Sequence, residues 1–122
     1  MKILIADDSA AMRQCIREML SGNDEILECA SGREAVLIFG LKRPDWVLMD
    51  IEMPEQDGLS AARQIRALFP EARIVFVTAH EGARLRTAAA QLGQGFVLKN
   101  QLEEIRQLIG PLAKQERGHE GS

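Results

Sequence analysis

Short apolar runs alternate along the chain with longer segments that have helical spacing. Residues 3–6, 46–49, 73–78 and 95–98 form runs that are mostly apolar. Runs of this length, bounded by charged or turn-forming residues, are typical of strands buried on both faces of a parallel sheet. Residues 25–30 alternate less regularly, so we expect a further strand there, near an edge of the sheet.

The segments between these runs carry apolar residues every three or four positions, which predicts helices. Their ranges are 9–20, 31–41, 59–69, 82–92 and 101–114. Ser9 and Ser31 precede two of these segments and are suitable N-caps, and Glu34 stands three residues after Ser31, as in a capping box. Pro111 falls inside the last segment, so we expect that helix to kink or to end early.

Five strand–helix units in succession imply a parallel sheet with helices on both faces. Right-handed crossovers leave few arrangements of such a sheet. We predict the flavodoxin-like arrangement, a doubly wound α/β fold with strand order 2-1-3-4-5 and five helices on two faces. We expect residues 1–114 to form one domain, and the polar residues 115–122, which include two glycines, to form a flexible tail.

Composition narrows the possible classes of protein. The chain has 122 residues, of which 46% are hydrophobic and 27% charged, as in an ordinary globular domain. A net charge of -3 argues against direct nucleic-acid binding, since such modules carry a basic face. No apolar run is long enough to span a membrane, so we expect a cytoplasmic protein. Cys15 and Cys29 lack metal-ligand spacing, and we expect both to be buried, reduced thiols.

Polar residues follow the predicted strands at the points where the strands end. Asp7 and Asp8 follow the first strand, Asp50 follows the run 46–49, Thr78 ends the fourth strand, and Lys99 follows the last. The carboxyl ends of parallel strands meet at one edge of the sheet, where ligands bind in this class of fold. We therefore expect these side chains to converge on one crevice.

This set of side chains has a specific chemistry. Crowded carboxylates need a cation if they are to remain ionised together, and an all-oxygen site suits Mg²⁺. Lys99 would attract an incoming anion, and the Thr78 hydroxyl would donate to a phosphoryl oxygen. A carboxylate placed beside these groups is suited to attack phosphorus and form an aspartyl phosphate.

Over residues 2–114 the sequence resembles the receiver domains of bacterial two-component response regulators. The residues that carry the resemblance are Asp7-Asp8, Asp50 within Met-Asp-Ile-Glu-Met-Pro-Glu-Gln-Asp-Gly, Thr78-Ala79 and Lys99. The resemblance implies a signalling switch that is a phosphoacceptor rather than an enzyme, although it assists its own phosphorylation and dephosphorylation.

By position, the resemblance implies that Asp50 is the phosphoacceptor and that Lys99 pairs with the phosphoryl group. It implies a Mg²⁺ ion held by Asp7 or Asp8 together with Asp50 and the backbone carbonyl of Glu52. In this family the second acidic residue of the pair is usually the direct ligand, and the first acts through water.

Further positions are implied to respond to phosphorylation. Thr78 would move toward the phosphoryl group, and Phe96, at the aromatic switch position, would move inward. Glu52 and His80 stand two residues after Asp50 and Thr78, where the family tunes the lifetime of the phosphoryl group. The surface formed by the segments 82–92, 95–98 and 101–114 would then change.

The implied partners are a sensor histidine kinase or phosphotransfer protein, and an output domain or target protein that receives the signal. A homodimer is a further possibility, because the last two helices carry charged residues that could pair across a symmetric interface. The alternative is that these residues form a solvated face: Arg84, Arg86, Glu103, Glu104 and Arg106. Asn100 replaces the proline that often follows the lysine, which leaves the geometry of that peptide open and resembles receivers joined to helix-turn-helix output domains. The chain is then either a stand-alone receiver or the receiver of a longer regulator.

Other functions on the same fold fit less well. A flavin or nucleotide site would need a phosphate-binding loop after the first strand, where Asp7 and Asp8 repel phosphate. A phosphatase with an aspartate nucleophile would want a second catalytic acid close behind it and the nucleophile on the first strand. A phosphorylation-independent interaction scaffold remains the main alternative, although the complete set of site residues argues against it.

Overall fold

A computed structural model describes residues 1–20, 22–79 and 82–110. The strands are β1 (Lys2–Ala6), β2 (Glu25–Cys29), β3 (Trp46–Met49), β4 (Ile74–Thr78) and β5 (Gly95–Leu98). The helices are α1 (Ala10–Glu18), α2 (Gly32–Lys42), α3 (Gly58–Leu68) and α4 (Ala83–Leu92). A fifth helical segment covers residues 104–110, and the expectations for Pro111 and for the tail 115–122 lie outside the described residues.

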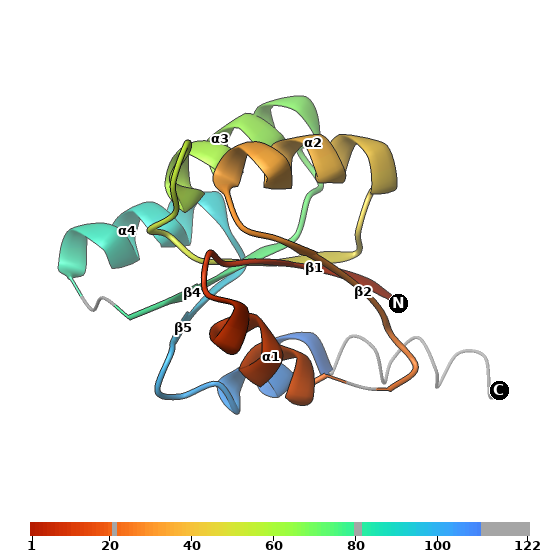
Figure 1. The fold of residues 1–122 in the computed structure, drawn as a ribbon. Coiled ribbons are helices and arrows are strands. Elements are labelled where there is room, and N and C mark those ends of the chain that lie inside the picture. Colours follow the sequence, from red (N-terminus) through yellow and green to blue (C-terminus); the bar gives the residue numbers. More distant parts are fainter. Residues whose placement is uncertain (21, 80–81, 111–122) are drawn as a thin grey trace, which may run out of the picture.

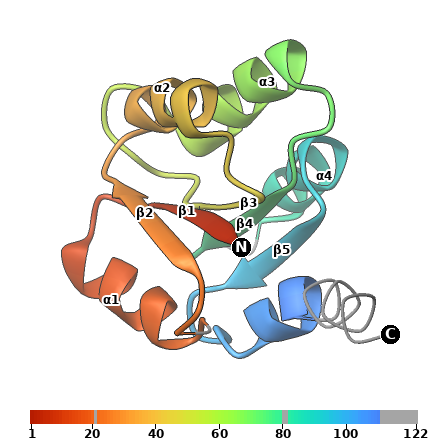
Figure 2. The ribbon, with the colours of Figure 1, turned by 90° about the vertical axis from the view of Figure 1, so that its right-hand side faces the viewer.

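The five strands form one parallel sheet in the order β2-β1-β3-β4-β5, which confirms the predicted flavodoxin-like topology (Figure 1). The weakly patterned strand β2 lies at the edge, as expected. In Figure 2, α2 and α3 cover one face of the sheet, and α1 and residues 104–110 cover the other. The helix α4 joins the α2–α3 side through contacts of its leucines with the core on that face.

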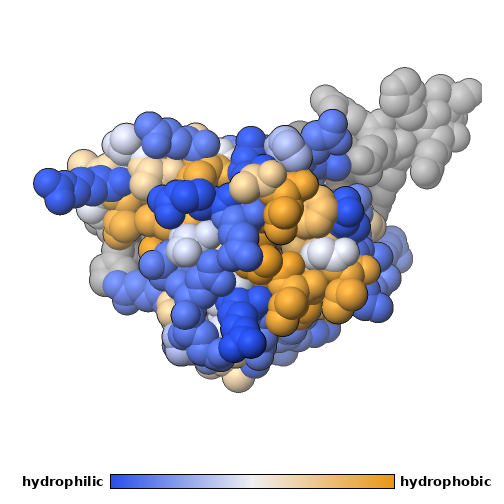
Figure 3. Space-filling view, turned by 90° about the horizontal axis from the view of Figure 1, so that it is seen from above, coloured by the Kyte–Doolittle hydropathy of each residue, from blue (hydrophilic) through white to orange (hydrophobic). Residues whose placement is uncertain are grey.

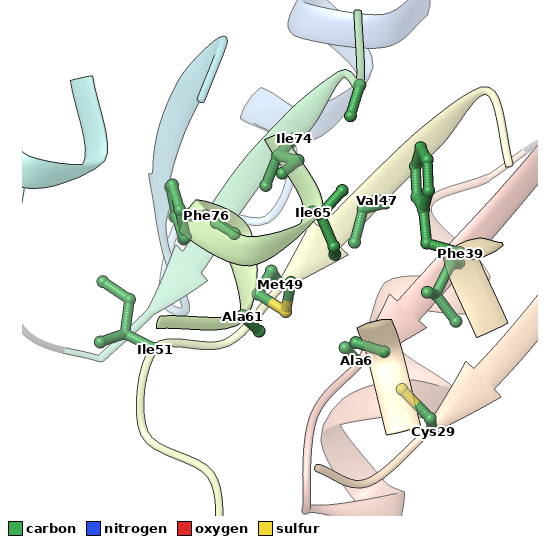
Figure 4. Packing of buried hydrophobic residues seen from close by; sticks show 14 of the residues in the cluster. Ala6, Cys29, Phe39, Val47, Met49, Ile51, Ala61, Ile65, Ile74 and Phe76 are labelled. Carbon is green, nitrogen blue, oxygen red and sulfur yellow. The ribbon is translucent and has the colours of Figure 1, made fainter. Parts of the chain in front are cut away.

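Each face of the sheet has its own core. Alternate residues of one strand belong to different cores: Leu4 and Ala6 of β1 pack toward α2 and α3, whereas Ile3 and Ile5 pack toward α1. Figure 4 shows the core on the first face, where side chains of α3 lie over side chains of β3. Because both faces are covered, the buried interior positions of the central strands are apolar, and polar residues such as Lys2 and Thr78 occur only at the strand ends, which explains the continuous apolar runs.

The helix starts depend on local hydrogen bonds that can be recognised in the sequence. The Oγ of Ser9 accepts from the N–H of Met12 at 3.2 Å, and the Oγ of Ser31 accepts from the N–H of Glu34 at 3.2 Å. The Glu34 carboxylate reaches back to the N–H of Ala30 at 2.9 Å, one residue before the position that a capping box predicts.

The expectation for the cysteines is correct for one and wrong for the other. Cys29 is buried at the end of β2, but Cys15 is exposed. Only Ile16 of α1 is fully buried, and Cys15 precedes it on the solvent side of the helix. The apolar stripe of α1 is therefore narrow, and residues of α1 beside it, such as Cys15, remain exposed to solvent.

Three large apolar side chains are exposed in the described part of the chain: Leu37 and Leu41 of α2 and Leu68 of α3. Figure 3 shows the α2–α3 side of the molecule, on which apolar residues are interleaved with charged ones. In the described residues, no helix is both long enough and apolar enough to cross a membrane.

Candidate functional site

Two neighbouring strands bring the central carboxylates together. In the parallel pair of β1 and β3, Ala6 is in register with Met49, so the residues that follow them, Asp7 and Asp50, emerge side by side. The N–H of Asp50 donates to the carbonyl of Ala6 at 2.8 Å, which extends the strand pairing to the site. Both carboxylates are buried, with 0% of Asp7 and 4% of Asp50 exposed, whereas Asp8 is exposed.

The acidic residues form a candidate metal site. One carboxylate oxygen from each of Asp7, Asp8 and Asp50 lies within 4.8 Å of the other two. The Oδ1 of Asp7 accepts from the N–H of Ser9 at 2.9 Å. Its Oδ2 is buried and accepts no aligned hydrogen bond from the described residues, although the Lys99 ammonium lies 3.0 Å away as an ion-pair partner. A buried oxygen of this kind, within an all-oxygen donor set that opens to solvent, fits Mg²⁺.

Lys99 supplies the positive charge that faces these carboxylates. Its Nζ lies 3.0 Å from Oδ2 of Asp7 and 3.2 Å from Oδ2 of Asp50. The backbone N–H of Lys99 donates to the carbonyl of Thr78 at 2.8 Å, so the end of β5 is fixed to the end of β4. The peptide between Lys99 and Asn100 is trans, since the described residues contain no cis peptide bond.

The electrostatics of the site leave Asp50 short of compensating charge. Burial raises the pKa of Asp50, the charge of Asp7 raises it further, and Lys99 opposes the shift without cancelling it. Burial acts to lower the pKa of Lys99, but its contacts with Asp7 and Asp50 outweigh burial and the pKa lies above its ordinary value. A divalent cation bound here would supply the missing positive charge.

These groups lie at an open crevice at the carboxyl edge of the sheet. Its lining residues are Asp8, Asp50, Glu52, Met53, Pro54, Asp57, Ala79 and Lys99. The sequence-based expectation that the strand ends converge is therefore correct for Asp7, Asp8, Asp50 and Lys99, although Asp7 is buried beneath the crevice lining. Glu52 also lines the crevice, whereas His80 lies outside the described residues.

Two expected site residues lie beside the crevice rather than on its surface. Thr78 is fully buried at the end of β4, next to Ala79. Phe96 is half-buried on β5, in register with Phe76 of β4. The ring of Phe96 packs against the core on the α2–α3 side, and the guanidinium of Arg86 lies 5.0 Å from its centroid.

Some residues that shape the site were not identified from the sequence. Arg13 of α1 donates from its Nη1 to the carbonyl of Asp7 at 2.7 Å, and no sequence signal points to this contact. A Cβ at Gly58 would lie 2.0 Å from the carbonyl oxygen of Asp50, so this position requires glycine. The Asp-Gly dipeptide is a turn signal, and it could have indicated this close approach as well.

Comparison with known proteins agrees with this geometry. The sequence matches the family described as "Response regulator receiver domain" over residues 3–110. The chain belongs to the receiver domains of two-component response regulators. The acidic cluster in this receiver is the kind of group that surrounds a phosphoacceptor site and its Mg²⁺.

Relatives of this receiver include proteins of similar and of greater length. It is 36% identical over 109 residues to Protein CcdB of Bacillus subtilis, covering 88% of this chain and 91% of that protein. It is 37% identical over 101 residues to the chemotaxis protein CheY of Bacillus subtilis, covering 80% of this chain and 84% of that protein. It is 35% identical over 115 residues to the response regulator MprA of Mycolicibacterium vanbaalenii, covering 88% of this chain and only 50% of that regulator.

Solved structures extend the likeness from sequence to fold. A LuxR-family two-component response regulator from Aurantimonas sp. SI85-9A1 superposes with a TM-score of 0.83 at 28% identity, covering 91% of this chain and 83% of that chain. A LuxR-family DNA-binding response regulator from Staphylococcus aureus gives a TM-score of 0.78 at 27% identity, covering 90% of this chain and 96% of that chain. The sequence-based resemblance to receivers of helix-turn-helix regulators is confirmed at this level.

Proposed function

We propose that this receiver is a phosphorylation-dependent signalling switch in which Asp50 accepts a phosphoryl group from a histidine kinase or a phosphotransfer protein. One observation carries the proposal. The Asp50 carboxylate lines an open crevice, with oxygens of Asp7 and Asp8 within 4.8 Å and the Lys99 ammonium at 3.2 Å. A nucleophile, a cation-binding group and an anion-binding group therefore share one accessible place.

Mg²⁺ would be held by the carboxylates of Asp7, Asp8 and Asp50 together with the backbone carbonyl of Glu52. When bound, this ion neutralises charge on the phosphoryl oxygens and on the crowded carboxylates. Asp7 is the most buried of the ligands and its backbone is fixed by Arg13, so it acts as the rigid part of the site. Asp8 is exposed and is the ligand that meets solvent.

The transfer step uses the oxygen of Asp50 as the nucleophile. That oxygen forms a bond to phosphorus while the bond from phosphorus to the donor imidazole nitrogen breaks, and the electron pair remains on the imidazole. Lys99 then exchanges one carboxylate contact for a phosphoryl oxygen. The Thr78 hydroxyl, at the neighbouring strand end, donates to another phosphoryl oxygen.

The output follows from the residues that flank the crevice. Movement of Thr78 would open space beside β4, and Phe96 on β5 is the aromatic ring that would move inward. The surface of α4, β5 and residues 104–110 would then differ between the two states and bind a target, an output domain or a second copy. This surface carries exposed charged side chains: Arg84, Arg86, Glu103 and Arg106.

Intact-mass measurement after incubation with acetyl phosphate and Mg²⁺ tests this function directly. We expect one phosphoryl adduct on the wild type and none after chelation or in Asp50→Ala. The control variant Asp45→Ala removes an exposed carboxylate at the opposite end of β3 and should keep the adduct. Absence of the adduct in folded wild type would reject the switch and favour a phosphorylation-independent interaction scaffold.

A further inference from the structure

The junction between β2 and α2, residues 29–32, contacts both of the acidic loops that form the site. The carbonyl of Cys29 accepts from the N–H of Asp7 at 3.1 Å, in the loop that carries Asp7 and Asp8. The N–H of Gly32 donates to the carbonyl of Gln56 at 3.0 Å, in the loop that follows Asp50. The junction 29–32 therefore joins the two loops through residues that do not line the crevice.

The contact at Gly32 leaves no space for a side chain. A Cβ at this position would lie 2.1 Å from the carbonyl oxygen of Gln56 and 3.0 Å from that of Asp57. Both neighbours are backbone atoms, which cannot rotate aside as the end of a side chain can. Gly32 is buried and is the first residue of α2, so its N–H is one of the donors that a helix leaves without an internal partner.

The loop that receives this contact is also fixed at its other end. The N–H of Gly58 donates to the carbonyl of Ile51 at 2.7 Å. The Nε2 of Gln56 donates to Oγ of Ser60 at 3.1 Å and to Oε1 of Gln64 at 3.0 Å. The printed hydrogen bonds of the loop 51–57 thus connect it to the start of α2 and to α3.

We infer that Gly32 is a positioning residue for the metal site. It sets the place of the loop 51–57, with its Glu52 carbonyl, relative to Asp7 and Asp8. This inference rests on the proposed function, because the ion that it concerns is Mg²⁺. Mg²⁺ requires near-ideal octahedral geometry at about 2.0–2.1 Å, so a small displacement of one ligand weakens binding. The pairing of Asp50 with Ala6 does not involve the junction and keeps those two strands together.

Replacement of Gly32 by alanine tests the inference, and α2 contains a matched control. A Cβ at Gly40, in the same helix, would meet no atom within 4 Å. We expect Gly32→Ala to weaken Mg²⁺ binding about tenfold, in the range found when groups behind metal ligands are removed. Gly40→Ala should leave the Mg²⁺ affinity, measured by isothermal titration calorimetry, unchanged.

The double variant Gly32→Ala/Gly40→Ala separates positioning from a general loss of stability. Alanine at the open position 40 favours the helix and offsets part of the destabilisation caused at position 32. We expect the Mg²⁺ affinity of the double variant to stay weakened while its melting temperature returns toward that of the wild type. Recovery of affinity together with stability would overturn the inference.

A second variant covers the case in which Gly32→Ala does not fold. Ser31→Ala adds no atoms and removes the hydroxyl that accepts from Glu34, which loosens the first turn of α2. We expect severalfold weaker Mg²⁺ binding and an unchanged site of phosphorylation at Asp50. Wild-type affinity in Ser31→Ala would contradict positioning by this junction. If the wild type itself binds no Mg²⁺, the proposed function fails first, and the two failures are distinguished.

Discussion

At the scale of single residues, Asp50 is buried between a negative charge, that of Asp7, and a positive charge, that of Lys99. Its raised pKa means that the folded protein disfavours the ionised carboxylate relative to the unfolded chain. The charged form of Asp50 therefore destabilises the apo protein at neutral pH. The site is arranged for a state in which additional positive charge is present.

Replacing Asp50 by its uncharged analogue tests this balance. In buffer without Mg²⁺ at neutral pH, we expect Asp50→Asn to raise the free energy of unfolding, because it removes repulsion by Asp7 in a buried place. With Mg²⁺ at a hundredfold excess over its Kd, the wild type should gain about 2.7 kcal/mol, and the variant should gain much less. Urea unfolding with and without Mg²⁺ measures both effects, with the exposed Glu71→Gln as a control. A variant less stable than wild type in chelator would contradict this interpretation.

Glu52 is exposed and lines the crevice that holds Asp50. We expect Glu52→Asn to change the rate of dephosphorylation more than the rate of phosphorylation by acetyl phosphate. The reason is that an exposed side chain in this crevice would meet the water that attacks the phosphoryl group, while the backbone carbonyl, which would hold the metal, is unchanged. Decay of the adduct followed by mass spectrometry gives the first rate, and its formation gives the second. Equal effects on both rates would exclude the tuning role.

The two cysteines offer a residue-scale test of burial. Cys15 is exposed, whereas burial raises the pKa of Cys29 to about 11. We expect a thiol reagent to modify Cys15 in the native protein and Cys29 only after unfolding.

The raised pKa of Cys29 also makes the stability of the protein depend on pH. Because the thiol of Cys29 ionises at lower pH in the unfolded chain than in the folded one, the unfolded state binds fewer protons between about pH 9 and 11. The free energy of unfolding therefore falls as pH rises through that window. Urea unfolding of wild type and Cys29→Ala at pH 8 and 10 should show a smaller fall for the variant.

At the scale of elements, the strands contribute stability through two-sided burial and the helices through one face only. Leu48 of β3 is fully buried, and Leu41 of α2 is 80% exposed. We expect Leu48→Ala to reduce the free energy of unfolding by about 2–5 kcal/mol, because it leaves a cavity in the core. Leu41→Gln should change it by no more than about 0.5 kcal/mol. Denaturant titrations of the two variants decide the matter, and a large loss in Leu41→Gln would show that α2 is packed differently.

The elements were predictable from the sequence to the extent that their causes are local. The apolar run Trp46–Met49 coincides with β3, and Ser9 and Ser31 cap the helices that they precede. The outward position of Cys15 was not predictable, because the rotation of α1 about its axis depends on how the helix packs on the sheet. The Glu34 carboxylate accepts from the N–H of Ala30 rather than from that of Ser31, the partner that a capping box predicts. This difference was not predictable for a similar reason, since the β2–α2 turn decides which N–H the carboxylate reaches.

At the scale of the whole molecule, parallel strands turn separate sequence signals into one site. Asp50 and Lys99 are far apart in the chain, but their strands end at the same edge, so their convergence followed from the predicted strand order. The contact between Gly32 and Gln56 could not be foreseen, because it joins two loops whose approach depends on how α2 and α3 pack. Positions at strand ends are therefore predictable from the sequence, whereas contacts between loops require the structure.

The concentration of chemistry at one edge of the sheet also has a consequence for protein engineering. The opposite edge has an exposed connection between α3 and β4 at Pro70 and Glu71. We expect a short glycine–serine insertion between these residues to leave Mg²⁺ binding and acetyl phosphate labelling intact, since added loop length costs little. The same insertion between Pro54 and Glu55 should abolish both, and calorimetry and mass spectrometry on the two proteins would show it. Reporter domains are thus best inserted at the edge of the sheet opposite the crevice that holds Asp50.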